Sequence, residues 1–381
     1  MNYILYDENR ESLFPLSYTR PISDIRTGIL TIREKWAKHL ATNLSVETAD
    51  YLQQKFPKKL EEDNVFINGG VCPTKEMATA IQQLADGEAL YARERLLAYR
   101  NTKQKKVNFN SEFIQIEKLW HIFQFNAKAL QADFDLITHG RNTQKLSDTN
   151  LLLGEENIFV EEGAKVEGAI LNATTGPIYI GANAEIMEGS IVRGPLAMCP
   201  NSVLKLGAKI YGATTLGPFC KVGGEVNNSV LMGYSNKGHD GFLGNSVLGE
   251  WCNIGADSNN SNLKNNYADV RLWSEQMSRF EKTGLQFCGL IMADHSKCGI
   301  NTMFNTGTVV GVSANIFGAG FPRNFVPSFA WGGTTGYSTY QLPKVFEVAE
   351  KVMARRGIDF DEIDKSILEK VYELTTKQRN F

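Results

Sequence analysis

Apolar residues recur at every sixth position through the middle of the chain. The eight positions that share this spacing are Ile180, Ile186, Val192, Met198, Leu204, Ile210, Leu216 and Val222. A period of six matches neither the 3.6-residue period of a helix nor the two-residue alternation of a strand. It is typical of a parallel β-helix, in which short strands turn corners and stack aliphatic side chains into an interior column. A run of ordinary β-hairpins is the alternative, but its alternation would be two rather than six.

The register of this repeat changes in the second half of the chain. The repeat starts irregularly near Ile158, loses its spacing near Asn228, and is interrupted by residues 263–285, which lack the period and are expected to form an insertion. Three residues at a spacing of six are expected to restore it afterwards: Ile300, Thr306 and Val312. We therefore predict a β-helix over residues 151–325 that carries one inserted segment.

Helix and strand patterns flank the repeat. Before residue 150, short apolar runs alternate with stretches whose apolar residues recur every three or four positions, which indicates an α/β domain with a largely parallel sheet. Thr27 is expected to cap the first helix. In the tail, two apolar stripes predict amphipathic helices that cover the open end of the β-helix, the second capped by Asp359 and Glu362. The predicted domains are residues 1–150, 151–325 and 326–381.

Composition excludes several classes of partner. The chain has 381 residues, a formal net charge of -2 and 43% hydrophobic residues, so neither nucleic acid nor an anionic membrane is expected to bind. The first residues lack the basic segment and apolar core of a signal peptide, and no apolar run is long enough to span a membrane. Six cysteines without a CxxC pair are typical of reduced thiols in a cytoplasmic protein.

A polar break in the repeat is the candidate site. Polar side chains cluster between positions 225 and 256, although both flanks are periodic, and a repeat departs from its own rule where function or a loop requires it. His239 is the only histidine of this polar segment, and Asp240 follows it. A neutral imidazole beside an acidic group is suited to accepting a proton near pH 7. From residue types alone, a solvated loop histidine is the alternative.

This segment resembles the hexapeptide-repeat acyltransferases, in particular the acetyltransferase half of the bifunctional sugar-1-phosphate nucleotidyltransferase/acetyltransferases that make UDP-N-acetylglucosamine. The matching stretches are Gly224-Glu-Val-Asn-Asn-Ser-Val-Leu231, Lys237-Gly-His-Asp-Gly-Phe-Leu-Gly-Asn-Ser246 and Gly249-Glu-Trp-Cys-Asn-Ile-Gly-Ala256. The resemblance implies a left-handed parallel β-helix in which His239 is the general base. It also implies substrate-binding roles for Glu225, Asn253, Asn262 and Arg271, and binding of acetyl-CoA beside Ala256 and Gly307. The sequence departs from the family at Phe242, where relatives carry tyrosine, and near Asn227, where a lysine is absent.

The start of the chain has a weaker resemblance. Leu13-Phe-Pro-Leu-Ser-Tyr-Thr-Arg-Pro21 is similar to a segment of sugar nucleotidyltransferases, but residues 7–12 replace the glycine-rich loop that would cradle a triphosphate. Arg20, Arg26 and Lys35 are the cations expected to neutralise phosphates. No Asp-x-Asp pair is evident, so the metal ligands stay unknown, and Mg²⁺ is expected only if this domain is active.

The two resemblances imply an enzyme of nucleotide-sugar biosynthesis. The resemblance implies acetyl-CoA-dependent N-acetylation of an amino-sugar phosphate, coupled to nucleotidyl transfer from a nucleoside triphosphate by an α/β nucleotidyltransferase-like N-terminal domain. It also implies a homotrimer, because a β-helix prism has flat faces that suit threefold packing. The alternative is a sugar-phosphate-binding protein whose β-helix is a non-catalytic oligomerisation scaffold.

Overall fold

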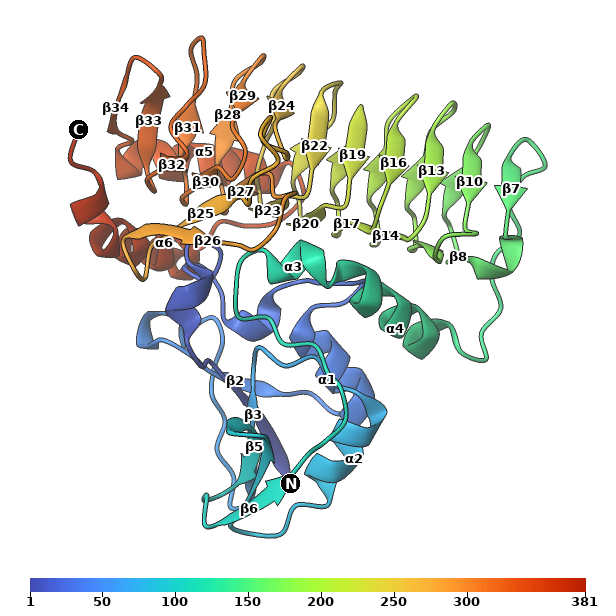
Figure 1. Ribbon diagram of the computed structural model, residues 1–381, viewed down its shortest axis with the longest axis vertical. Helices are drawn as coiled ribbons and strands as arrows, with labels where there is room; N and C mark the ends of the chain where they lie inside the picture. Colours follow the sequence, from blue (N-terminus) through green and yellow to red (C-terminus); the bar gives the residue numbers. More distant parts are fainter.

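The computed structural model describes residues 1–381 and has three parts, shown in Figure 1. A long β-helix carries an α/β domain on one side, and two helices follow at the C-terminus. The predicted combination of an N-terminal α/β domain, a parallel β-helix and C-terminal helices is therefore confirmed. None of the helices combines the length and the apolar character that crossing a membrane would require.

The N-terminal domain is built on a six-stranded sheet of order β2-β1-β3-β5-β4-β6. Its strands are β1 (Asn2–Tyr6), β2 (Ser45–Glu47), β3 (Asn64–Asn68), β4 (Glu88–Ala92), β5 (Arg95–Arg100) and β6 (Lys105–Asn108), and its helices are α1 (Ile32–Leu40), α2 (Lys75–Gln82), α3 (His121–Gln124) and α4 (Asn126–Thr138). The sheet is mixed rather than largely parallel, because β5 runs antiparallel to both β3 and β4. Helix α1 starts later than predicted, because Thr31 caps it through a reciprocal pair of hydrogen bonds with Glu34. Thr27 instead donates to the Ile122 carbonyl.

The β-helix has three faces, which we name by what covers them. The free face carries β7 (Leu151–Leu153), β10 (Ile170–Asn172), β13 (Ile191–Arg193), β16 (Lys209–Tyr211), β19 (Glu225–Asn227) and β22 (Phe242–Gly244), with β24 (Asn259–Asn260) and β29 (Met303–Phe304) paired beyond them. The domain face carries β8 (Ile158–Val160), β11 (Ile178–Ile180), β14 (Leu196–Met198), β17 (Thr214–Leu216), β20 (Val230–Gly233), β23 (Val247–Glu250), β27 (Ile291–Met292), β30 (Val309–Val310) and β32 (Phe325–Val326). The tail face carries β9 (Lys165–Val166), β12 (Glu185–Ile186), β15 (Val203–Leu204), β18 (Lys221–Val222), β21 (Asn236–Lys237), β28 (Lys297–Cys298), β31 (Asn315–Ile316) and β33 (Ala330–Gly333).

The interior column follows the predicted spacing from position 180 to position 222. All eight residues are at most 2% exposed and belong to one core cluster. The register then shortens: Lys209 pairs with Glu225, sixteen positions on, whereas Ile191 pairs with Lys209, eighteen positions on. After the insertion the inward residues are Cys298, Phe304, Val310 and Ile316. The expected Ile300 is 70% exposed, so the predicted register there is wrong by two residues.

The insertion forms an antiparallel hairpin of β25 (Arg271–Ser274) and β26 (Arg279–Lys282). The β-helix ends in β33, which pairs with the short antiparallel strand β34 (Gly336–Thr339). Strands β32 and β33 extend beyond the predicted boundary at residue 325, because one more coil follows it. All six cysteines are free and buried.

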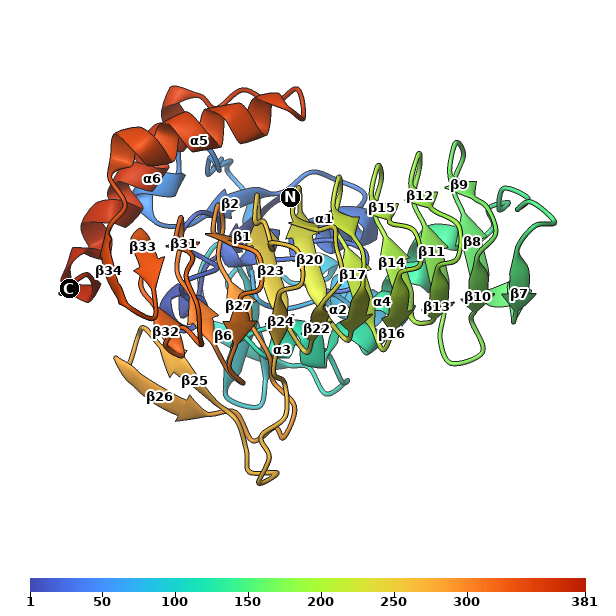
Figure 2. The same ribbon diagram turned by 90° about the horizontal axis from the view of Figure 1, so that it is seen from above.

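The domain face is covered by the N-terminal domain, and Figures 1 and 2 both show α4 running along it. Asn126 of α4 donates from its side-chain amide to the Ala213 carbonyl at 2.8 Å, and the Thr215 hydroxyl donates to the Gly28 carbonyl at 2.9 Å. These buried hydrogen bonds satisfy polar groups of both parts, so the two domains form one packed unit.

The tail helices α5 (Leu342–Ala354) and α6 (Glu362–Leu374) do more than cover the end of the β-helix. Their buried residues join the same core cluster as the N-terminal domain, and Lys55 of that domain pairs with Asp364 at 2.5 Å. Asp361, rather than Asp359, caps α6 through the amide of Asp364. Helix α5 turns back beside the tail face, so its C-terminal end reaches the middle coils of the β-helix.

Candidate functional site

His239 lies at the corner between the tail face and the free face, at the rim of a cavity of about 610 Å³. The side chain is exposed, and its imidazole forms no hydrogen bond within the chain. The cavity is bounded on one side by the coils of the tail face and on the other by the end of α5. A solvent-accessible imidazole at such a rim can meet a substrate and exchange a proton with it.

A buried lysine holds the turn that carries His239. Lys237 lies in the interior column, paired with Val222 of the preceding coil. The column below it is aliphatic, and Lys237 is only 1% exposed. Its ammonium group donates to the Gly223 carbonyl at 3.0 Å and to the His239 carbonyl at 2.5 Å. Burial lowers the pKa of Lys237 to about 8, with Asp240 acting in the opposite direction. A lysine at a position of the aliphatic column is the sequence signal by which Lys237 could have been found.

Two other residues of the predicted site lie in the same cavity. Asn253 and Ala256 both line it, and Ala256 follows His239 by seventeen positions. Strands pair with this offset here, since Asn236 bridges to Asn253, so Ala256 lies one coil beyond His239 at the same corner. The predicted base, one predicted substrate residue and one predicted acetyl-CoA residue are thus brought together.

Glu225 and Asn262 lie on the other side of the His239 turn. Glu225 is on the free face, where it pairs with Phe242 and accepts a hydrogen bond from the Tyr211 hydroxyl at 2.6 Å. Asn262 lies one coil beyond Asn245 and donates to its side-chain oxygen at 2.8 Å. The predicted residues therefore form two groups, one in the cavity and one along the free face, with the His239 turn between them.

Arg271 and Gly307 are adjacent to each other but lie outside both groups. Arg271 is an exposed residue at the start of β25. Gly307 is buried beneath that strand: a Cβ atom on it would lie 2.5 Å from the Arg271 carbonyl and 2.7 Å from Val270. The inserted hairpin therefore closes the position at which acetyl-CoA was expected beside Gly307.

Basic residues that no sequence pattern links to His239 also line the cavity. Its lining includes five basic residues and no carboxylate: Lys205, Lys221, Lys297, Arg355 and Arg356. Burial lowers the pKa of Lys221, and the charges of the two arginines and of Lys205 lower it further. Burial also lowers the pKa of Lys297 to about 8. The arginines come from the end of α5, more than one hundred residues after the His239 turn, so no local pattern linked them to it.

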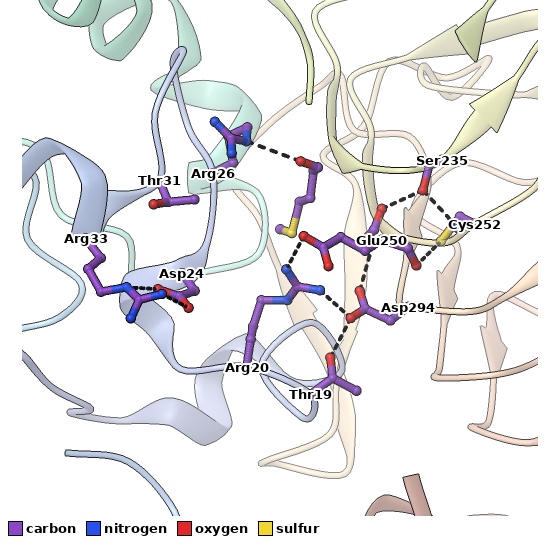
Figure 3. Close-up of polar contacts among 12 residues, drawn as sticks. Thr19, Arg20, Asp24, Arg26, Thr31, Arg33, Ser235, Glu250, Cys252 and Asp294 are labelled. Carbon is purple, nitrogen blue, oxygen red and sulfur yellow. Dashed lines mark hydrogen bonds and ion pairs between the residues drawn. The ribbon is translucent and has the colours of Figure 1, made fainter. Parts of the chain in front are cut away.

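The three cations predicted to bind phosphate in the N-terminal domain are buried and already paired. Arg20 is 6% exposed and lies between Glu250, at 3.0 Å, and Asp294 of the β-helix, as Figure 3 shows. The Thr19 hydroxyl also donates to Asp294, at 2.6 Å. Burial alone would lower the pKa of Arg20, but the two carboxylates raise it above its ordinary value. Arg20 therefore joins the two domains.

Arg26 and Lys35 are likewise internal. Arg26 is 8% exposed and donates to the Met232 carbonyl of β20 at 3.2 Å, a contact that crosses the domain boundary. Lys35 is 3% exposed and pairs with Asp133, which also accepts the Ile29 amide at 2.8 Å. Their charges are balanced within the chain, so phosphate binding by either residue would require its present partner to be displaced.

A second cavity, of about 810 Å³, lies where β1 and β2 end. The crevice at the carboxyl ends of parallel strands is the usual ligand site of α/β sheets. Tyrosine side chains line it, and the Tyr6 hydroxyl is buried there without a hydrogen-bond partner. Asp7 also lines it, but its carboxylate accepts the Ile22 amide at 2.8 Å and the Thr48 hydroxyl.

No group of three His, Cys, Asp or Glu side chains in the chain could hold a metal ion.

Comparison with known proteins matches only part of the chain to a family. A family model described as sugar nucleotidyl transferase matches residues 3–142. No curated protein sequence matches significantly. Among solved structures, the UDP-N-acetylglucosamine acyltransferase of Arabidopsis is similar at 13% identity and a TM-score of 0.26, over 62% of this chain and 94% of that one. That of Campylobacter jejuni is similar at 15% identity and a TM-score of 0.18, over 62% and 92%. Structural similarity at these scores carries no argument about function.

Proposed function

We propose that the chain is an acetyl-CoA-dependent N-acetyltransferase that acts on an amino-sugar phosphate, and that its N-terminal domain transfers a nucleotidyl group to a sugar 1-phosphate. The observation that carries the first part is that His239, Asn253 and Ala256 line one cavity. These are the residues to which the sequence resemblance gives the roles of base, sugar ligand and acetyl-CoA neighbour. The family match of residues 3–142 supports the second part.

The transfer requires a base, a group that stabilises the oxyanion, and alignment of the two substrates. The amine of the sugar attacks the carbonyl carbon of the thioester, and His239 accepts the proton that the amine loses. The carbon–sulfur bond then breaks, and the thiolate of CoA leaves and takes up a proton, which completes the amide. A backbone N–H of the neighbouring coil would stabilise the developing oxyanion. Because the thioester is already activated, alignment of the two substrates supplies much of the rate.

The two groups of polar residues suggest how the substrates are divided. The acyl donor would occupy the cavity on the tail face, and the acceptor sugar would lie along the free face near Glu225 and Asn262. The His239 turn separates the two groups and would face both substrates. Phe242 lies on the acceptor side, where relatives carry a tyrosine. Because Phe242 has no hydroxyl, the acceptor sugar would differ from theirs at the group that this hydroxyl contacts.

We place nucleotide binding in the crevice at the ends of β1 and β2. Its tyrosine side chains would stack on a base, and Mg²⁺ would be held by one or two carboxylates together with phosphate oxygens of the nucleotide. Because Arg20, Arg26 and Lys35 are paired internally, another cation of the crevice would meet the phosphates, and Lys103 lines it without an ion pair.

A homotrimer is part of the proposal. The N-terminal domain covers the domain face and α5 borders the tail face, but the free face exposes apolar residues in its first coils, among them Ile170 at 37% and Ile191 at 49%. An exposed apolar strip of this kind suits contact with a second copy of the chain. The same row of the free face passes through Lys209 to Glu225, so a neighbouring subunit on this face would border the acceptor site.

The test is release of CoA thiol from acetyl-CoA with a panel of amino-sugar phosphates. His239→Ala should lower the rate by roughly 10²–10⁴-fold while donor binding stays intact. His139, which is exposed in the linker far from the cavity, provides the matched control, and His139→Ala should react like wild type. Absence of thiol release from wild type with every acceptor would favour the non-catalytic scaffold instead.

A further inference from the structure

The cavity beside His239, which we call the tail groove, has a one-sided charge. Lys205 and Lys221 project from adjacent coils of the tail face, and Lys297 lies three coils beyond Lys221. Arg355 and Arg356 line the same cavity from the end of α5. None of the five forms an ion pair, whereas most buried cations of the chain do, as Arg20 and Lys35 illustrate. Positive charges that approach one another without a carboxylate are unfavourable in a folded chain.

The hydrogen bonding of the groove is also incomplete. The Nε atom of Arg356 is buried and has no partner, and its terminal nitrogen reaches only the Asn236 side-chain oxygen, at 3.3 Å. Lys297 donates to the His295 carbonyl at 2.8 Å, which leaves two of its three protons free. A buried N–H donor without a partner costs free energy unless a ligand accepts from it.

Aromatic and apolar side chains also line the groove. Tyr234 and Trp251 stack with ring centroids 4.2 Å apart and an interplanar angle of 14°, and both line the groove. Ile300 also lines it and is 70% exposed. A ligand that fits these features combines a flat or apolar part with a polyanion such as a diphosphate, because several cations line the groove without a carboxylate and arginine binds phosphate oxygens bidentately.

We propose that the tail groove binds the diphosphate of a nucleoside-diphosphate ligand, with Arg356 and Lys221 contacting the phosphate oxygens. The helix α5 is then part of a binding site as well as a cover for the β-helix. The identity of the ligand rests on the proposed function: CoA, the acyl donor, contains such a diphosphate and would bring its thioester toward His239. A nucleotide drawn from the N-terminal reaction contains the same group and would act as an effector.

Calorimetry on the full chain separates these sources. Titrations with CoA, with UDP and with inorganic pyrophosphate are run on wild type, Arg356→Gln and Lys221→Gln. Lys165 lies on the same face, exposed and away from the groove, so Lys165→Gln is the matched control. We expect CoA to bind wild type, pyrophosphate to compete with it, and each groove variant to bind at least about tenfold more weakly, because each loses a charge-assisted contact. The control should bind like wild type, and unchanged melting temperatures would show that the variants fold.

The outcomes distinguish this inference from the proposed function. If UDP binds and CoA does not, the diphosphate site stands and the acetyltransferase loses its donor. If thiol release proceeds but the groove variants keep the wild-type KM for acetyl-CoA and the wild-type affinity for UDP, the transferase stands and the groove assignment is overturned. Absence of binding of all three compounds to wild type overturns the inference as well.

Discussion

Glu275 offers a pH-dependent test of how the three parts of the chain are joined. The residue follows β25 in the inserted hairpin, and its Oε2 atom accepts the Tyr18 hydroxyl of the N-terminal domain and the Gln378 side chain of the tail, each at 2.7 Å. Its Oε1 atom is buried without a partner. Burial raises the pKa of Glu275 to about 7, although the two hydrogen bonds act in the opposite direction.

The sign of the effect follows from this direction. A carboxyl group whose pKa is raised by folding contributes its full stability below the unfolded pKa, which is 4.5, and loses it as the pH rises through the folded pKa near 7. A difference of about 2.5 pKa units corresponds to about 3 kcal/mol, at 1.36 kcal/mol per unit. The glutamine side chain of Glu275→Gln mimics the neutral acid and does not titrate. As the pH rises from 5 to 8.5, wild type should therefore lose most of this unfolding free energy, whereas the variant should keep it.

Urea unfolding at the two pH values measures this difference. Asp269→Asn, at an exposed carboxylate of the same insertion, serves as the control and is not expected to share the effect. A Glu275→Gln variant that is destabilised equally at pH 5 and pH 8.5 would show that the carboxyl group is ionised in the folded protein, which would refute the reasoning from burial.

Three further substitutions test the fold, the site and the assembly. Ile210→Asp places an unpaired charge in the interior column, where Ile210 is 2% exposed, and should cost several kcal/mol of unfolding free energy; an unchanged melting temperature would contradict the register. Lys237→Met keeps an unbranched chain in the column but removes the ammonium from the His239 turn, so kcat for thiol release should fall at least about tenfold with the KM for acetyl-CoA unchanged, whereas a lowered melting temperature with full kcat would point to a purely structural lysine. Ile191→Asp should leave the monomer folded and abolish the trimer in light scattering, and a persistent trimer would exclude the free face as the interface.

The sequence predicted the β-helix because each interior position is recorded directly in the spacing. One residue of each short strand faces the interior column, and successive strands of a coil are six residues apart. An apolar residue therefore recurs at every sixth position of the sequence. The prediction slipped after the insertion, where a hairpin adds residues that obey no period and Cys298 rather than Ile300 faces inward. Likewise, both Thr27 and Thr31 are suitable caps in isolation, and only the reciprocal contact with Glu34 decides between them.

The candidate site could be predicted where its residues are related by the coil length. His239 and Ala256 share a corner because seventeen residues separate them, which is the local offset between paired strands. Arg356 could not be found in this way, since the path of α5 depends on packing against distant parts of the chain. For the same reason the sequence does not show that Arg20 pairs with Asp294, 274 positions away. Arg20 was therefore expected to bind phosphate.

The contacts between the α/β domain and the β-helix make the connection at residues 139–150 dispensable for holding the chain together. Arg20 and Arg26 anchor one side, and Asn126 anchors the other, all through buried partners on the β-helix. Proteolytic cleavage in that exposed stretch should therefore leave two polypeptides that co-elute as one particle. The same argument makes it a natural place to divide the coding sequence, with both halves produced together and assembling into an intact protein.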